Sequence, residues 1–155
     1  MENTRERVAT AYVIERDGTI FQAFDPMYWA YHLGGKTNTA TQASTIGIEI
    51  VNWGPLTIKN GEHLNWIGDR IPTIQVVKTE KPFRGVVAFH KFSDPQYGAV
   101  KALIEDLCTT FSIPELYPRN PEDVLANVNS FFPGIYSHQN FPQGQSRHWP
   151  CMGLE

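Results

Sequence analysis

Apolar and polar positions along the first third of the chain indicate short β-strands. Residues 8–15 are rich in β-branched and aromatic side chains, which is typical of a strand. An Arg-Asp-Gly turn follows at residues 16–18, and Asp-Gly is a frequent tight-turn pair, so residues 19–24 are expected to return as the second arm of a hairpin. Residues 44–52 are mostly apolar, which predicts a strand buried on both faces of a sheet.

The clearest helical pattern covers residues 95–111. Ser93 or Asp94 can cap this helix, and Pro95 suits its first turn. Apolar side chains recur at the spacing of one helix face, and they are Val100, Leu103, Ile104, Leu107 and Phe111. We expect this stripe to pack across one face of a β-sheet.

The other segments give weaker patterns. Residues 54–82 contain glycine, proline, asparagine and scattered aromatics without a sustained period, so we expect a long surface loop there. A short helix is predicted over residues 121–128, and a last strand over residues 131–137. A chain of 155 residues fits one domain, and these elements indicate a single α/β domain over residues 1–155.

Composition narrows the class of partner. Thirteen basic and sixteen acidic residues give a net charge of −3 without a cluster of lysine and arginine, so a nucleic-acid polymer is not expected. No apolar run is long enough to span a membrane. The amino terminus is polar and no apolar region follows it, so we expect no secretory signal and a cytoplasmic location. Of the two cysteines, Cys108 is expected to be a buried small hydrophobe.

Histidines are the first candidates for chemistry. His32, His90 and His138 stand at the ends of predicted elements. A lone histidine is more often a hydrogen-bonded structural residue than a ligand, and we keep that interpretation for His90 and for His63, which looks exposed. His32 and His138 are the stronger candidates because of the residues around them.

Several segments in order resemble the zinc-type N-acetylmuramoyl-L-alanine amidases, the family shared by bacteriophage lysozyme-type amidases and peptidoglycan recognition proteins. The segments are YVIERDGTI at 12–20, WAYHLG at 29–34, STIGIE at 44–49, FRG at 83–85, FSIP at 111–114 and GIYSH at 134–138. The match covers most of residues 8–141. It implies a central mixed β-sheet flanked by helices. It also implies cleavage of the bond between N-acetylmuramic acid and the first L-alanine of the stem peptide.

The resemblance assigns roles to individual residues. In the family, zinc is held by two histidines and an aspartate or cysteine, and zinc-bound water has a pKa of about 7. Glu49 matches the general base that takes the proton of this water. His138 matches the second zinc histidine, and His32 matches a histidine that lines the muropeptide groove. With His32, we assign Trp29 and Arg147 to substrate binding.

The chain departs from the family pattern at the other zinc ligands. The family's first zinc histidine lies on a strand that precedes residue 8, and none of the seven residues there is a histidine. The usual aspartate, with its lysine two residues earlier, is missing after His138. His148 and Cys151 stand in that region and could complete a zinc site. All three ligands would then come from one terminal stretch without predicted regular structure, which is poor preorganisation for a catalytic metal.

These departures leave different functional hypotheses open. The first is a peptidoglycan amidase with weak or absent catalysis. The second is a non-catalytic protein of the same fold that holds a muropeptide or another small ligand, such as a nucleotide-type signal. The third is a truncated or split product whose partner chain supplies the missing strand and histidine.

The missing strand also bears on assembly. Loss of a strand from inside the sheet would leave an open edge beside residues 8–15 and 44–52, so we expect self-association or a partner chain that restores the strand. The alternative is a sheet that has closed around the gap. Glu49 and His138 are expected to lie together at one end of the sheet with His32 on the rim of the same cleft. The aromatic side chains of Tyr28, Trp29 and Trp53 are expected to pack in the core rather than to line that cleft.

Overall fold

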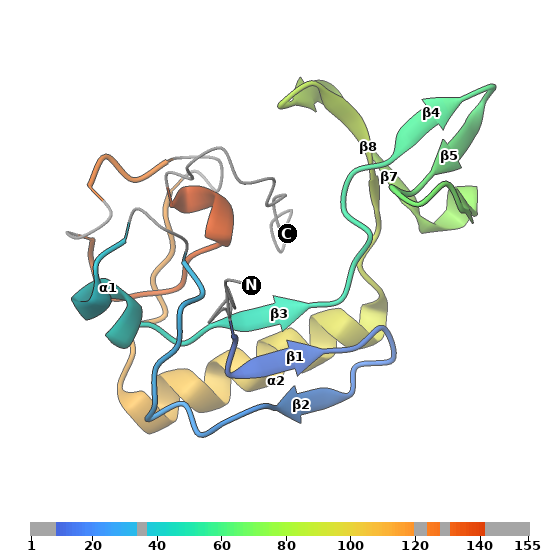
Figure 1. The fold of residues 1–155 in the computed structure, drawn as a ribbon. Helices are drawn as coiled ribbons and strands as arrows, with labels where there is room; N and C mark the ends of the chain where they lie inside the picture. The colour runs from blue at the N-terminus through green and yellow to red at the C-terminus, as the bar shows by residue number, and fades with distance from the viewer. Residues whose placement is uncertain (1–8, 34–36, 120–123, 128–130, 142–155) are drawn as a thin grey trace, which may run out of the picture.

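The computed structural model describes residues 9–33, 37–119, 124–127 and 131–141. Two parts are visible in Figure 1. One is a small sheet with a long helix packed along it. We call this part the helix–sheet layer, and its elements are β1 (Tyr12–Ile14), β2 (Ile20–Gln22), α1 (Thr39–Ala43), β3 (Ile48–Ile50) and α2 (Asp94–Phe111). The other consists of strands within residues 57–90 that project from the end of this layer, and we call these strands, β4 to β8, the β-extension.

A mixed sheet forms the centre of the helix–sheet layer. Its strands in spatial order are β2 (Ile20–Gln22), β1 (Tyr12–Ile14) and β3 (Ile48–Ile50). β2 runs antiparallel to β1, and β3 runs parallel to it. In the turn after β1, the Asp17 carboxylate accepts a hydrogen bond from the Thr19 N–H at 2.9 Å. The expected hairpin, the mixed sheet and the α/β class are confirmed.

Helix α2 (Asp94–Phe111) packs on one face of this sheet. Ser93 is its N-cap, and the side chains of Ser93 and Gln96 form a reciprocal capping box. Val100, Leu103 and Leu107 are buried in one cluster with the β1 residues, as the stripe predicts. Each large side chain buried in this way contributes about 1.5–3 kcal/mol. Cys108 is also buried, as expected.

The third strand is shorter than predicted and is not buried on both faces. Helix α1 (Thr39–Ala43) ends just before the apolar segment, whose first residue, Ser44, is the C-cap of the helix. Ile48 and Ile50 are half-buried against the core, whereas Glu49 between them is exposed. Successive side chains of a strand point to opposite faces, so Glu49 lies on the face away from α2.

The expected loop over residues 54–82 is wrong, because this region is largely β-structure. A meander contains β4 (Thr57–Lys59), β5 (Glu62–Leu64) and β6 (Arg70–Ile71), and a 3₁₀ turn η1 (Thr73–Gln75) leads to the hairpin of β7 (Val76–Phe83) and β8 (Val86–His90). Asn60-Gly61 and Arg84-Gly85 form the hairpin turns with positive φ at both positions. His63 on β5 is buried rather than exposed.

The C-terminal described residues, 124–127 and 131–141, form little regular structure. Residues 131–137 do not form the expected strand. A single 3₁₀ turn, η2 (His138–Asn140), follows them. Rings of Phe131, Tyr136 and Phe141 contact one another edge to face, so aromatic packing replaces a strand ladder here. Residues 124–127 are not helical, and the rest of the predicted helix at 121–128 lies outside the described residues.

The edges of the mixed sheet bear on the expected gap. β1 and β3 pair directly with each other in parallel, from Tyr12 opposite Ile48 to Ile14 opposite Ile50. The outer edge of β3 meets no other strand among the described residues. Association through this edge stays a prediction. Within the described ranges, no helix combines the length and apolarity needed to cross a membrane.

Candidate functional site

Glu49 lies on the face of the mixed sheet that α2 does not cover. It stands opposite Val13 on β1, and Val13 stands opposite Phe21 on β2. Side chains at directly paired positions point to the same face, so these residues form a row across the sheet, which we call the open-face row. Phe21 is 54% exposed and Glu49 is also exposed. The prediction of a strand buried on both faces is therefore wrong at Glu49, which lies at the middle of β3 and is exposed.

His32 is fixed by hydrogen bonds on both ring nitrogens. Nδ1 lies 2.9 Å from the Ala30 carbonyl oxygen, and Nε2 lies 2.9 Å from the Thr45 hydroxyl. Burial lowers the pKa of His32, with the Ala30 contact opposing this, so the ring is neutral at pH 7. A carbonyl only accepts, so Nδ1 carries the hydrogen. Nε2 lies against the Thr45 hydroxyl, whose single hydrogen is also within reach of the carbonyl oxygens of Thr41 and Gln42.

The backbone around His32 is held as firmly as its ring. The amide oxygen of Gln42, on α1, accepts the N–H groups of both His32 and Leu33. The ring lies directly over Gly47, where an added Cβ would come 2.9 Å from His32 Cγ. His32 therefore joins its own segment to α1 and to the start of β3. The expected groove-lining role of this histidine is not tested, but its ring nitrogens are already engaged inside the protein.

The aromatic residues before His32 are exposed rather than packed in the core. Trp29 is 42% exposed, and its ring lies 5.2 Å from that of Tyr31 in an edge-on arrangement. Tyr28 and Trp53 also count among the exposed large side chains. The core expectation for these aromatics is wrong, because the buried cluster of the layer is filled by residues of β1 and α2.

The predicted zinc site stays untested, because two of its three ligands lie outside the described residues. His138 is half-buried in η2, and Figure 1 shows its segment, in orange-red, on the β3 side of the sheet rather than the β2 side. The described residues contain no group of three or more His, Cys, Asp or Glu side chains arranged to hold a metal ion. Arg147, His148 and Cys151 lie outside the described residues. Zinc binding, and the proximity of Glu49 to His138, stay predictions.

A buried polar junction that the sequence did not indicate joins the layer to the β-extension. Gln96 is only 1% exposed, and its Nε2 donates to the carbonyl oxygen of Val51 at 2.8 Å. His90 is buried at the end of β8, and its Nδ1 accepts the Trp53 N–H at 3.3 Å. Burial and the charge of Arg16 lower the pKa of His90 to about 4. The structural interpretation of His90 agrees with these contacts.

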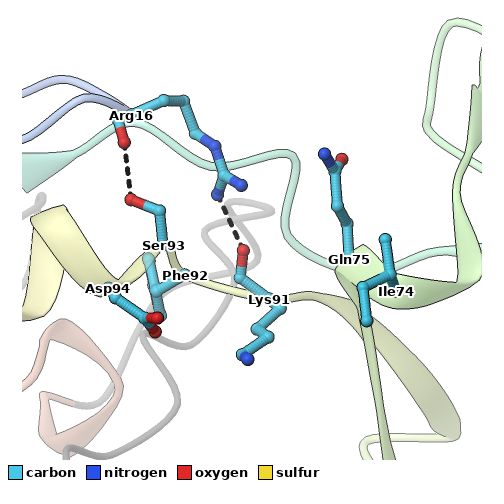
Figure 2. Close-up of a pocket in the computed structure, with 7 residues that line it drawn as sticks. All are labelled: Arg16, Ile74, Gln75, Lys91, Phe92, Ser93 and Asp94. Carbon is cyan, nitrogen blue, oxygen red and sulfur yellow. Dashed lines mark hydrogen bonds between the residues drawn. The ribbon is translucent and has the colours of Figure 1, made fainter.

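A cavity of about 290 Å³ opens at this junction. Figure 2 shows the residues that line it, and they are Arg16, Ile74, Gln75, Lys91, Phe92, Ser93 and Asp94. The guanidinium of Arg16 donates to the carbonyl oxygen of Lys91 at 2.7 Å. The cavity contains none of the residues assigned to the site by sequence.

The mixed sheet crossed by a capped helix places the protein among the α/β folds. A family model described as N-acetylmuramoyl-L-alanine amidase matches residues 1–150. The chain therefore belongs to this amidase family, and at the family level its function is that of a peptidoglycan amidase-like hydrolase. Searches of curated proteins and of solved structures returned no match.

Proposed function

We propose that the protein binds a peptidoglycan fragment on the open face of β1, β2 and β3, and that it hydrolyses this ligand weakly or not at all. The observation that carries the proposal is the open-face row, which puts an exposed carboxylate beside apolar side chains. Family membership supplies the ligand class.

The chemistry of this face suits a sugar joined to a peptide. The Glu49 carboxylate can accept hydrogen bonds from ligand N–H and hydroxyl groups, and bonds to a charged acceptor are the stronger ones. The exposed ring of Phe21 offers an apolar surface to a sugar or an alanine methyl group. Trp29 is also exposed, and it belongs to the segment that His32 holds against Gly47. Gly47 precedes Glu49 by two residues.

We expect weak hydrolysis because the chain matches only one of the family's three zinc ligands. A bound zinc ion would supply an activated water, and Glu49 would be the base beside it. Of the described residues, only His138 matches a family ligand, and no three-ligand group accompanies it. The remaining candidates, His148 and Cys151, are proposed substitutes without a family counterpart.

Binding is tested by calorimetric titration with N-acetylmuramoyl-L-alanyl-D-isoglutamine. We expect Glu49→Gln to weaken binding roughly tenfold, since a charge-assisted hydrogen bond is worth about 1.5–3 kcal/mol. Glu62→Gln is the matched control, because Glu62 is a glutamate of the β-extension that forms a surface ion pair with Arg70. If Glu49→Gln and the parent protein bind the ligand with equal affinity, the ligand does not bind at Glu49 on the open face.

Hydrolysis is tested on the same preparations by chromatography of stem peptides released from cell wall, together with zinc analysis by mass spectrometry. We expect traces of product at most. If zinc is bound, His148→Ala and Cys151→Ala should both release it. Rapid hydrolysis that a chelator stops and Glu49→Gln abolishes would show an active zinc amidase instead.

A further inference from the structure

We propose that the cavity between the β1–β2 turn, η1 and the start of α2 binds a small carboxylate ligand through Arg16. This inference does not depend on the proposed function, since the cavity contains neither Glu49 nor any other residue of the open-face row.

Arg16 is anchored on one side only. Its Nη1 donates to the Lys91 carbonyl oxygen at 2.7 Å and to the Gln96 amide oxygen at 3.3 Å. The backbone oxygen of Arg16 accepts the Ser93 hydroxyl, which holds the turn against α2. In the described part of the chain, Nε and Nη2 of Arg16 donate to no residue. A fixed guanidinium with a free edge is preorganised for a two-point contact with a carboxylate.

Arg16 forms no ion pair with another described residue. The ion pairs found among those residues are Arg70 with Glu62 and Lys101 with Glu105. Partial burial lowers the pKa of Arg16, because it disfavours the charged form of the guanidinium. Asp94 also lines the cavity, but Figure 2 shows its carboxylate on the other side of the chain from the guanidinium. An incoming anion would therefore meet a net attraction.

The other lining groups indicate the rest of the ligand. Figure 2 shows the Gln75 amide on the same side of the chain as the Arg16 guanidinium, with Ile74 beside it. Ile74 is 84% exposed, and such an exposed apolar side chain gains from contact with an aliphatic group. A cavity of about 290 Å³ is at the lower end of ligand pockets. The class that fits is a carboxylate with a neighbouring amide and a small aliphatic group, as in an N-acylated amino acid or the end of a short peptide.

The test is a titration of ¹⁵N-labelled protein with N-acetyl-L-alanine, followed through the Nε–H signal of Arg16. We expect a saturable shift of this signal. The uncharged N-acetyl-L-alaninamide should leave it in place. Inorganic phosphate can also pair with the guanidinium, but it should bind more weakly because it has no amide or aliphatic group to contact Gln75 and Ile74. An equal response to the amide, tighter binding of phosphate, or no shift of the Arg16 signal would each overturn the proposal.

Variants separate the ligand role of Arg16 from its structural one. Arg16→Lys keeps the charge but loses the fork, and we expect affinity for N-acetyl-L-alanine to fall roughly tenfold. Gln75→Ala leaves the anchoring contacts of Arg16 intact and should weaken binding several-fold. Lys59→Gln removes a lysine from exposed β4 and should leave binding unchanged. If Gln75→Ala binds N-acetyl-L-alanine as well as Lys59→Gln and the parent protein do, the cavity is not the binding site of this ligand.

Discussion

The helix–sheet layer and the β-extension are stabilised in different ways. The layer buries a continuous cluster in which Leu103 and Leu107 of α2 meet Ile14 of β1. The extension has a small cluster of Leu56, Ile71 and Ala88. It also leaves large apolar side chains in solvent, among them Trp66, which is 77% exposed.

The difference follows from the long helix of the layer. An 18-residue helix presents several apolar side chains to one sheet face, so a single layer closes a core. Strands of two or three residues, such as β5 and β6, present one or two side chains each. Their stability depends mainly on turns and on cross-strand pairs. We therefore expect the layer to hold the global stability of the protein and the extension to open locally.

The largest expected effect comes from a matched pair of core substitutions. Ile14 and Ile71 are both buried, the first in the layer and the second in the extension. Ile14→Ala should lower the free energy of unfolding by about 4 kcal/mol, and Ile71→Ala by about 2 kcal/mol, because a larger cavity remains in the denser cluster. Urea unfolding measures both values.

Hydrogen exchange then shows where each loss falls. Ile71→Ala should speed exchange in β4 to β8 while the amides of α2 keep their protection. Ile14→Ala should speed exchange throughout. Equal losses of protection in both parts after Ile71→Ala would mean that the two parts unfold as one unit.

The next effect concerns the junction between the two parts and depends on pH. The pKa of His90 is lowered to about 4, mainly by burial, whereas an unfolded histidine titrates at about 6.5. The unfolded state therefore binds the proton first, so stability is unaffected above pH 6.5 and falls as the pH drops from 6.5 towards 4. The full loss is about 3 kcal/mol. The lowered pKa of His32 acts in the same direction.

His90→Asn isolates the contribution of this histidine. The Asn oxygen can replace Nδ1 as the acceptor of the Trp53 N–H but carries no titratable group. Urea unfolding at pH 7 and pH 4.5 should show a clearly smaller loss of stability in His90→Asn than in the parent protein. The same pH dependence in both proteins would assign the acid sensitivity to other groups.

Much of the layer could be predicted from the sequence because its signals are local and repeated. The capped α2 shows an apolar residue at each turn, and the first hairpin carries Asp-Gly at its turn. The extension carried comparable turn chemistry in Asn60-Gly61, the strongest short-range hairpin signal, but the strands on either side of it, β4 and β5, are too short for alternation to be recognised.

The candidate site was less predictable because its geometry depends on tertiary contacts. The exposure of Glu49 follows from alternation with Ile48 and Ile50, so the sequence did contain that signal. The position of His32 could not be predicted in this way, because it depends on a hydrogen bond to helix α1. That helix has only five residues, too few to show a helical period in the sequence. The buried state of His63 likewise depends on how the extension packs.

The smallest expected effect tests whether His32 and Gly47 position the layer's edge as one unit. A Cβ on Gly47 would lie 2.9 Å from Cγ and 3.1 Å from Cδ2 of His32, and hydrogen bonds on both ring nitrogens oppose a shift of the ring. Gly47→Ala should therefore cost about 1–3 kcal/mol of stability, as overpacking does. Gly98→Ala is the control, because Gly98 is an exposed position of helix α2 where an added Cβ meets nothing within 4 Å, and it should stabilise by about 0.5–1 kcal/mol.

The double variant His32→Ala/Gly47→Ala decides whether the contact itself is responsible. Removing the ring relieves the clash, so the loss in the double variant should be smaller than the sum of the two single losses by about 1 kcal/mol or more. Urea unfolding of the four proteins of this cycle measures the coupling. Additive losses would mean that the backbone at Gly47, rather than its contact with His32, makes the glycine necessary. Since Trp29 belongs to the segment that this contact fixes, a strong coupling would also tie the proposed ligand face to the same pair of residues.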